Sequence, residues 1–343
     1  MSNDSRPRLR DIAARAGVSI STVSLVINDK PGVSDETRRE VRSLLTEFGY
    51  RSSRRKTVDR SRTILFAVYD RSEIVASHNP FFNAVLRGVE REARRNGYGL
   101  TVTYVREGAL LDAFIASIAE SPPGGVLIDA SVMEDPTMRR VLEYREGPLV
   151  AMDNYFPDIP VDTVAIDNHG GARAAVQYLI RMGHARIGTV GSSIATRNFD
   201  ERRNAFLETL AQAELRANPA WQYAVRPAQD AAYTDMTAAL TRGIDLPDAL
   251  FCQNDLIAFG VIRALKEHGV RVPGDVSIVA FDDLPFCDVL EPRLSTVHVH
   301  IERMAAIAVK RMIERIDAGA EEFTKTRIGT EFIPRDSVKP PNI

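Results

Sequence analysis

Hydrophobic residues beyond position 62 form short apolar runs that alternate with amphipathic stretches. Apolar runs of about four to eight residues are typical of buried strands, and apolar residues three and four apart are typical of one helix face. Strands are predicted at residues 63–69, 100–105, 125–128, 149–152, 161–166, 186–190, 221–225, 249–252 and 276–281. Helices are predicted at residues 80–95, 110–120, 170–182, 201–211, 255–268 and 301–317.

This alternation predicts an α/β body. Apolar strands separated by helices form parallel sheets that carry helices on both faces. About 280 residues exceed what one such core holds, so we expect two doubly wound parallel-sheet lobes. Open α/β sheets bind ligands at the carboxyl ends of their strands, and two facing lobes would form a cleft there.

The first 60 residues have a different pattern, which predicts a small all-α head. Its three helices are expected at residues 9–16, 19–27 and 34–48. Gly17 and Gly49 are suited to helix ends, and Ser19 and Ser34 to N-caps, because a serine hydroxyl accepts a bond from a free first-turn amide. The short turn between the first two helices is typical of a helix-turn-helix, whose second helix enters the DNA major groove.

The second of these helices has an outer face suited to DNA. Its valines fit a small core, which leaves Ile20, Ser21 and Leu25 outward. Exposed Ile20 and Leu25 need a partner, and a thymine methyl group is one; a protein-binding helix is the alternative. Short polar side chains are suited to phosphate oxygens. The expected phosphate contacts are Ser19, Thr22, Ser24 and Asn28.

Charge separates the head from the body. The 343 residues include 44 Lys+Arg and 46 Asp+Glu, a net charge of -2. Residues 1–62 hold 14 basic and 8 acidic residues, and the remainder holds 30 and 38. This basic segment favours a polyanionic partner, although a solvated arginine-rich surface has the same composition. Residues 51–62 are predicted to be a tether in which Arg54, Arg55 and Lys56 attract phosphates.

Other functional classes have little support in the sequence. Cys252 and Cys287 are too few for a disulfide scaffold and suit a reducing compartment. The sequence has neither an apolar run of about 18 residues nor a signal-peptide pattern, so we expect a cytoplasmic, nucleoid-associated protein. No P-loop sequence or metal-ligand cluster is found, and a metal pair at His298 and His300 is the weaker alternative. We therefore expect no catalytic residue, metal or cofactor.

Polar residues directly after predicted strands are the candidates for a ligand site. Asp153, Asn254 and Asp282 each stand at such a position, and Arg202 opens the helix after residues 186–190. Carboxylates, amides and a guanidinium can hydrogen-bond several hydroxyl groups of a sugar or polyol at once. Each can instead serve as a helix cap, which is the favoured interpretation for Asp255.

Characteristic residues at fixed spacing run through the head. They are Arg8-Leu-Arg-Asp-Ile-Ala-Ala-Arg-Ala-Gly-Val-Ser19, Thr22-Val-Ser24, Asn28, Pro31-Gly-Val-Ser34 and Phe48-Gly-Tyr50. The segment resembles the headpiece of lactose-repressor-type (LacI/GalR) regulators, whose second helix reads an operator half-site, which puts Ile20, Ser21 and Leu25 at base-reading positions. Arg8 replaces the usual cap residue, and Leu25 stands where Arg or Lys is frequent, which predicts a different operator.

The linker departs from the same family. Related proteins often have a hinge helix here, which wedges a leucine into the minor groove. In this chain Ser52-Ser53 replaces the usual start, and Val58 is the sole apolar candidate for the wedge. Electrostatic anchoring is therefore favoured over a fully formed wedge.

The body resembles the effector domain of these regulators, which is akin to periplasmic sugar-binding proteins. The resemblance rests on Asn79-Pro-Phe-Phe82, Gly183-His184, Asn254-Asp255, Phe281-Asp-Asp283 and Leu294-Ser-Thr296. It implies effector contacts from Phe82, Asp153, Arg202, Asn254 and Asp282, with Phe81 packing. It also implies that residues 63–165 and 296–327 form the N-terminal lobe, and that residues 166–295 and 328–343 form the C-terminal lobe.

These observations favour a homodimeric repressor. One head reads few base pairs, so a two-fold dimer on a near-palindromic operator is expected. A small molecule in the cleft, most simply a sugar or sugar derivative, would control operator affinity. A cytoplasmic sugar-processing enzyme and a transport-type sugar receptor with an added helical head are the alternatives.

Overall fold

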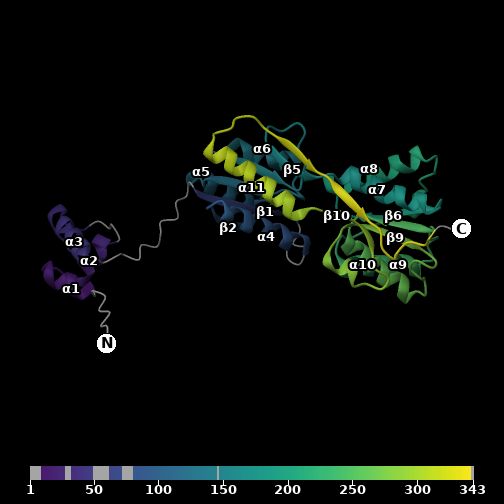
Figure 1. The fold of residues 1–343 in the computed structure, drawn as a ribbon, viewed down its shortest axis with the longest axis horizontal. Coiled ribbons are helices and arrows are strands. Elements are labelled where there is room, and N and C mark those ends of the chain that lie inside the picture. Colours follow the sequence, from purple (N-terminus) through teal and green to yellow (C-terminus); the bar gives the residue numbers. More distant parts are fainter. Residues whose placement is uncertain (1–8, 28–31, 49–61, 72–79, 145–146, 341–343) are drawn as a thin grey trace. The chain divides into compact units, whose positions relative to one another are not determined.

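The structure is a computed structural model that describes residues 9–27, 32–48, 62–71, 80–144 and 147–340 (Figure 1). Its contacts divide the chain into two compact units, Met1–Asp59 and Arg60–Ile343. The first unit is the head and the second is the body.

The described part of the head contains three short helices. They are α1 (Leu9–Arg15), α2 (Ile20–Ile27) and α3 (Asp35–Glu47). Ile12, Val23 and Val41, one from each helix, are fully buried in one apolar cluster. Five or so residues of this size make a small core that can hold three short helices together but little more. The prediction that the valines of the second helix enter a small core is confirmed.

The ends of the head helices follow from single residues. The Ser19 hydroxyl accepts a bond from the Thr22 amide at 3.0 Å, and the Ser34 hydroxyl accepts one from the Thr37 amide at 3.3 Å. Gly17 has a φ of 62°, a conformation that costs glycine little because it has no Cβ. The predicted N-caps at both serines are therefore confirmed.

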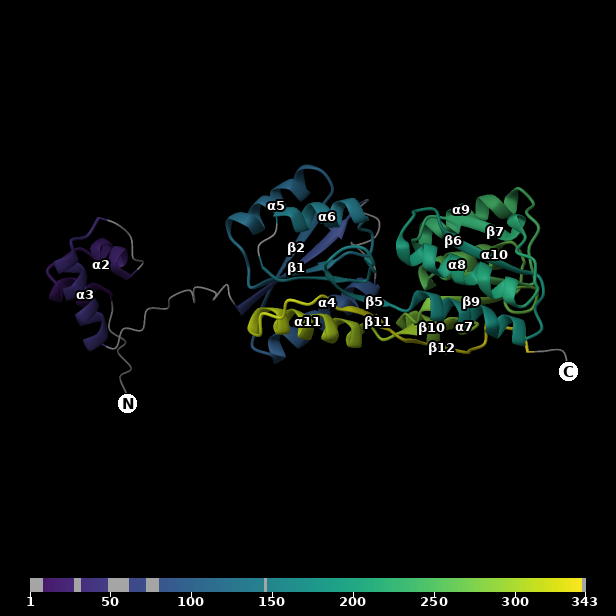
Figure 2. The same ribbon diagram turned by 90° about the horizontal axis from the view of Figure 1, so that it is seen from above.

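The first lobe of the body is a parallel sheet between two pairs of helices. Its strands, in the order β11-β5-β4-β3-β1-β2, are β1 (Thr63–Asp70), β2 (Gly99–Arg106), β3 (Gly125–Asp129), β4 (Leu149–Met152), β5 (Asp162–Ile166) and β11 (Lys325–Ile328). Its helices are α4 (Pro80–Arg95), α5 (Ala109–Glu120), α6 (Asp135–Tyr144) and α11 (Ile301–Asp317). Phe66 and Val68 of β1 pack toward α4 and α11, whereas Ala67 and Tyr69 pack toward α5 and α6. Figure 2 shows these helix pairs on opposite faces of the sheet.

The second lobe repeats this plan. Its strands, in the order β12-β10-β9-β8-β6-β7, are β6 (Ile187–Ser192), β7 (Gln222–Val225), β8 (Ala249–Cys252), β9 (Ser277–Asp282), β10 (Ser295–Val299) and β12 (Thr330–Ile333). Its helices are α7 (Asn168–Arg181), α8 (Arg197–Gln212), α9 (Gln229–Thr241) and α10 (Asp255–Glu267), with short 3-10 turns η2 (Pro219–Trp221) and η3 (Pro285–Asp288). Phe251 packs toward α7 and α8, and Leu250 and Cys252 pack toward α9 and α10. Only β12 runs antiparallel to its neighbour in the described sheet.

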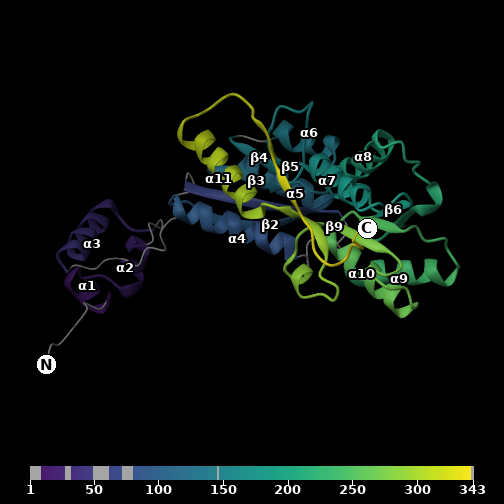
Figure 3. The ribbon, with the colours of Figure 1, turned by 45° about the vertical axis from the view of Figure 1, so that its right-hand side comes forward.

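The chain crosses between the lobes after β5, β10 and β11, and the last crossing is visible in Figure 3. Three expected boundaries differ from the structure. Ile166 and Ile328 were expected in the C-terminal lobe, but they pair with each other in the first sheet, at the ends of β5 and β11. Residues 296–299 were expected in the N-terminal lobe, but β10 pairs with β9 and β12 in the second sheet. Backbone pairing with β9 holds this segment in the second lobe until Val299, and α11 then packs on the first.

The predicted architecture is confirmed: a small all-α head with the helix-turn-helix arrangement, and an α/β body of two doubly wound lobes. Two helices, α6 and α9, were not predicted, and α8 begins at Arg197 rather than Glu201. The alanines and threonines of α9 leave its apolar stripe weak. Among the described helices, none is long and apolar enough to cross a membrane.

Candidate functional site

The outer face of α2 carries the residues expected to contact DNA. Ile20 is 47% exposed and Ser21 is exposed, as predicted. Leu25 was expected outward but is only half-buried, because it directly precedes Val26, which enters the core. An exposed isoleucine on a short helix loses free energy in water unless a partner covers it. The described part of α2 therefore has an apolar contact point at Ile20.

The hydroxyl groups of α2 are partly committed within the helix. The Ser19 hydroxyl lies 2.6 Å from that of Ser21 and 2.8 Å from that of Thr22, in addition to its capping bond. Each hydroxyl still has lone pairs or a proton for a further partner. Ser24 is half-buried. Five other expected contacts lie outside the described residues: Asn28, Arg54, Arg55, Lys56 and Val58.

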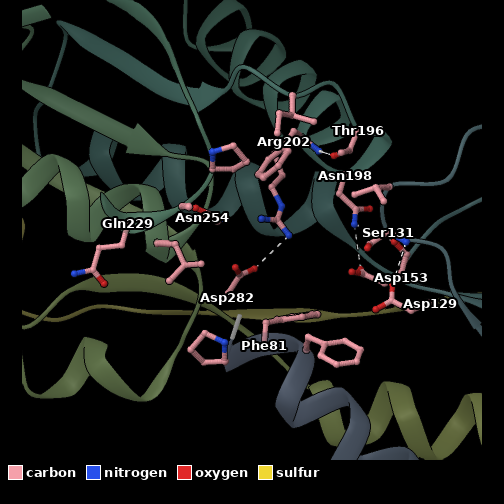
Figure 4. Close-up of a pocket in the computed structure, with 18 of the residues that line it drawn as sticks. Phe81, Asp129, Ser131, Asp153, Thr196, Asn198, Arg202, Gln229, Asn254 and Asp282 are labelled. Atoms are coloured by element: carbon pink, nitrogen blue, oxygen red, sulfur yellow. Dashed lines mark hydrogen bonds and ion pairs between the residues drawn. The ribbon is translucent and has the colours of Figure 1, made fainter. Parts of the chain in front are cut away.

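The body contains a cavity of about 630 Å³ between its lobes (Figure 4). Both sheets place the second strand at an edge, followed by the first, third and fourth. The cavity is lined from the carboxyl ends of these strands, by Asp129 and Asp153 in the first lobe and by Asn254 and Asp282 in the second. This is where open α/β sheets bind ligands, and the volume is that of a small-molecule site.

Arg202 and Asp282 form the wall of the second lobe. The Arg202 Nη2 atom lies 3.3 Å from an Asp282 carboxylate oxygen, and both side chains are buried. The other guanidinium nitrogens donate to Asn168 Oδ1 at 2.8 Å and to the Gln253 carbonyl at 2.7 Å. The guanidinium also lies 3.7 Å from the centre of the Phe281 ring. Every edge of Arg202 is therefore held before a ligand enters.

Two opposing effects act on the pKa of the Asp282 carboxyl. Burial raises the pKa of Asp282 above its usual value, and the Arg202 guanidinium opposes that shift. Asp282 also has a φ of 116°, which side chains with a Cβ rarely adopt and which is typical of functional sites under strain. The Asp282 carboxylate stands at the end of β9 and lines the cavity (Figure 4).

Asn254 and Asp255 have structural bonds. Asn254 lines the cavity, but its side-chain oxygen accepts a bond from the Ile257 amide at 2.8 Å and caps α10. Asp255 was expected to be the cap; instead it is fully buried and accepts bonds from the Leu284 amide and the Thr296 hydroxyl. The amide nitrogen of Asn254 remains the group that a ligand could accept from.

The wall of the first lobe carries two acidic side chains. Asp129 and Asp153 follow adjacent strands, and each is 8% exposed. Burial raises the pKa of Asp153 well above its usual value, the charge of Asp129 raises it further, and Arg202 opposes both effects. Burial also raises the pKa of Asp129, and bonds from Ser131 oppose it. Asp153 has a φ of 55°, so this wall is strained too.

Aromatic side chains from the start of α4 complete the cavity. Phe82 was expected to line it, and it does, although it is 6% exposed and stacks on Phe66 with ring centres 6.4 Å apart. Phe81 packs against the apolar clusters of both lobes, as expected, and its half-buried ring also lines the cavity (Figure 4). The more accessible ring is therefore that of Phe81.

Helix α8 connects the two lobes beside the cavity. Asn198 donates to the Asp153 carbonyl at 3.0 Å and to its carboxylate at 3.1 Å. Arg197 pairs with Asp135 of the first lobe at 2.7 Å. Glu201 pairs with Arg327 of β11 at 2.8 Å. The first turn of α8 is thus bonded to the opposite lobe at three places.

Sequence reasoning missed several lining residues. Asp129 stands directly after the predicted strand at residues 125–128, so the rule that selected Asp153 would also have found it. Asn198 lines the cavity, and Asn168 holds Arg202 from outside the lining; neither carried such a signal, because their bonds to Asp153 and Arg202 arise only from tertiary packing. The other missed lining residues include Ser131, Thr196 and Gln229.

Comparison with known proteins identifies the family. Residues 8–53 match the family model described as bacterial regulatory proteins, lacI family, and residues 176–338 match the one described as periplasmic binding protein-like domain. The HTH-type transcriptional repressor PurR of Haemophilus influenzae is 30% identical over 335 residues, which cover 96% of this chain and 98% of that protein. The chain belongs to the lacI family of bacterial regulatory proteins. Members such as PurR are transcriptional repressors and not enzymes, and this lacI-family chain is a DNA-binding transcriptional repressor.

Solved structures agree with this assignment. The transcriptional regulator CelR–cellobiose complex is 29% identical, with a TM-score of 0.73 over 97% of this chain and 100% of that one. The lac repressor dimer bound to operator and the anti-inducer ONPF has a TM-score of 0.73 at 22% identity, covers 97% of this chain and 99% of that chain, and shares the fold.

Proposed function

We propose that this lacI-family repressor is a homodimer whose affinity for a near-palindromic operator is controlled by a sugar-like effector in the inter-lobe cavity. The observation that carries the proposal is the cavity itself, which draws polar groups from the strand ends of both lobes. A ligand that bonds to both walls binds one lobe orientation better than another, and such differential binding is what shifts a conformational equilibrium.

The chemistry of the cavity favours a polyhydroxylated effector. Arg202, Asp282 and Asn254 can donate to and accept from neighbouring hydroxyls on one face, and Asp153 can accept from the opposite face. Phe81 and Phe82 offer apolar faces to the C–H surface of a sugar ring. The CelR relative is described as a cellobiose complex, which supports a carbohydrate.

In the head, we assign base contacts to Ile20, Ser21 and Leu25. Ser19, Thr22 and Ser24, together with Asn28, are assigned to phosphates, and the basic linker residues Arg54, Arg55 and Lys56 would add salt-dependent attraction, with Val58 as a minor wedge. The effector would alter lobe orientation and hence the spacing of two heads in a dimer, with a coupling of about 1–3 kcal/mol. We assign residues 1–60 to the DNA-binding headpiece. The protein would act in the cytoplasm, at the nucleoid.

The DNA assignment is tested on operator DNA selected from a random pool. Ile20→Ala should weaken binding by about 1 kcal/mol, roughly fivefold, because a thymine methyl contact is lost. Ser21→Ala should also weaken binding, and Ser43→Ala, an exposed serine on α3, is its matched control. Affinity should fall steeply with salt. A salt-independent affinity, or equal effects of the two serine variants, would contradict the assignment.

The effector assignment is tested by thermal shift with a panel of neutral sugars. We expect at least one sugar to raise the melting temperature of the protein and to change its affinity for operator DNA. Asp282→Asn should reduce the stabilisation, because the carboxylate is replaced by an amide beside Arg202. Asp200→Asn, exposed in the first turn of α8, is the matched control. An unchanged response in Asp282→Asn would remove that residue from the site.

A further inference from the structure

Two consecutive residues at the end of β9 have a left-handed backbone. Asp282 has a φ of 116° and Asp283 has a φ of 58°. Side chains with a Cβ disfavour this region, so two such residues in a row cost free energy and persist only where other contacts fix them. The Asp282 carboxylate lines the cavity and pairs with Arg202, whereas the Asp283 carboxylate contacts other elements of the second lobe. The contacts of Asp283 therefore help to fix the turn that carries Asp282.

The Asp283 carboxylate is held from two sides. One of its oxygens lies 2.8 Å from His298 Nδ1 in β10, and the other lies 2.8 Å from Arg335 Nη2 in the segment after β12. The side chains of Asp283 and Arg335 are only 15% and 11% exposed. The next residue, Leu284, donates its amide to Asp255 at 2.7 Å. The turn after β9 is thus bonded to β10, to the segment after β12 and to the start of α10.

His298 stands where both crossing strands leave the second lobe. In the sheet it lies opposite Asp282 of β9 and opposite Glu331 of β12. Strand β10 ends at Val299, and the chain continues into α11 on the first lobe. Strand β12 begins at Thr330, directly after the crossing from β11. A contact at His298 therefore reaches two of the segments that join the lobes.

One peptide bond joins the cavity wall to this contact. Asp282 faces Arg202 beside the cavity, and Asp283 faces His298 at the crossing. A ligand that bonds to the Asp282 carboxylate shifts the torsions of the turn, and the planar peptide bond passes that shift to the next residue. Packed elements respond to small shifts by changing between discrete arrangements rather than by deforming continuously.

We infer that Asp283 is a positioning residue that links effector contact at Asp282 to the orientation of the two lobes, through His298 at the crossing. The inference rests on the proposed function, in which an effector in the cavity controls operator affinity. Asp283 acts without touching the effector. It determines how much of the effector's differential binding reaches the lobe equilibrium, and hence how strongly the effector changes operator affinity.

The test measures the operator affinity of the full-length protein without sugar and with a saturating concentration of the tightest binder among glucose, galactose, mannose, ribose and cellobiose. Saturation removes the influence of sugar affinity, so the ratio of the two operator affinities reports the coupling alone. Ratios of about 5–150-fold are typical. In Asp283→Gly we expect the ratio to move towards one by roughly threefold or more, because glycine adopts the positive φ but lacks the carboxylate.

Asp288→Asn is the matched control. The Asp288 carboxylate accepts from the same Arg335 at 2.7 Å, but it is exposed and lies in η3, so this variant should keep the wild-type ratio. Asp283→Asn tolerates positive φ and retains an acceptor oxygen. It should give an intermediate ratio, and it carries the test if Asp283→Gly does not fold. Adding His298→Phe to Asp283→Gly should lower the ratio no further, because both substitutions act through one contact.

The outcomes separate a positioning role from a structural one. An unchanged ratio in Asp283→Gly, whatever its melting temperature, would make Asp283 a structural residue only and overturn the inference. An equal change in Asp288→Asn would transfer the effect to Arg335 and overturn the link through His298.

A further measurement needs no sugar. If no sugar of the panel binds, or none changes operator affinity, the proposed function fails, and hydrogen exchange of the ligand-free protein decides the role of Asp283. Asp283→Gly should lose amide protection in β10 and β12 relative to Asp288→Asn, because the bond that holds the turn to the crossing is gone. Equal protection in the two variants would overturn the positioning role.

Discussion

Both walls of the cavity carry buried aspartates, but only the wall of the second lobe pairs its aspartate with a cation. In the second lobe, Asp282 faces Arg202, whose remaining donors are bonded to Asn168 and the Gln253 carbonyl. In the first lobe, Asp129 and Asp153 stand at the ends of adjacent strands, and burial and the charge of Asp129 both raise the cost of ionising Asp153. One wall is therefore organised before a ligand arrives, and the other is incomplete without one.

This difference has a physical consequence for stability. A buried ion pair costs desolvation energy, but it repays part of that cost when its geometry is good. The desolvation cost of two buried acids is not offset when no cation pairs with them. A ligand that neutralises them would therefore stabilise the folded protein. Binding sites commonly carry such local instability, because residues chosen for a ligand are seldom the most stable choice.

The largest predicted effect comes from breaking the organised wall. Arg202→Ala leaves Asp282 buried without its cation and removes the bonds to Asn168 and the Gln253 carbonyl. Removing one partner of a buried pair typically costs about 3–5 kcal/mol, and we expect a loss of that size in the free energy of unfolding of the body, measured in urea. Arg203→Ala is the control, because the neighbouring arginine is exposed on the same helix.

The two arginine variants should differ widely. A loss below about 1 kcal/mol in Arg202→Ala, similar to that of a surface substitution, would show that solvent enters and screens Asp282. The second wall would then be no better organised than the first, and the contrast between the lobes would disappear.

A smaller effect, of opposite sign, is predicted for the incomplete wall. Asp153→Asn removes one of two repelling acids and keeps the oxygen that accepts from Asn198. It also places a residue that tolerates positive φ at a φ of 55°. We expect the ligand-free body to become more stable by about 1 kcal/mol, a typical size for one substitution. Chemical denaturation at pH 8 measures it.

The pH dependence of stability tests the direction of the pKa shift of Asp153. The folded-state pKa of Asp153 is raised by burial and by Asp129, so the folded protein keeps this proton at pH values where the unfolded chain has lost it. Its stabilising contribution is present at low pH and is lost as the pH rises through the folded pKa. As the pH rises above the usual aspartate pKa of about 3.9, the stability of the wild-type chain should therefore decline more than that of Asp153→Asn. Parallel profiles would mean that Asp153 is solvated.

The sequence predicts the two walls unequally well. Asp153 and Asp282 were found because each follows an apolar run, and the carboxyl ends of parallel strands meet where ligands bind. The partners of Arg202 were not found, because a guanidinium can bond to any acceptor that tertiary packing brings near it. The same holds for β10, which was not among the predicted strands and whose place in the second sheet is decided only by its pairing with β9. Helix α9 was missed because its many small residues give no clear apolar stripe.

The smallest predicted effect concerns the bonds that hold the walls together. Arg197 and Asp135 join the lobes at 2.7 Å, and their side chains are 34% and 33% exposed. A pair with this exposure contributes at most about 1 kcal/mol. Arg197→Ala should therefore leave the free energy of unfolding almost unchanged.

Loss of the Arg197–Asp135 pair should have a clearer effect on the equilibrium between closed and open lobe arrangements than on unfolding. The pair exists only when α8 contacts the first lobe, so removing it disfavours that arrangement relative to any more open one. A change of about 1 kcal/mol would lower the affinity for a ligand that bridges the walls by roughly fivefold. Calorimetry with the tightest sugar of the panel measures this, and Arg203→Ala is again the control.

A double-mutant cycle with Asp135→Asn isolates the pair, and its coupling should shrink at high salt because the charges are partly exposed. A full effect on affinity at high salt would show that Arg197 acts on the ligand directly, which would make the organised wall larger than the geometry indicates.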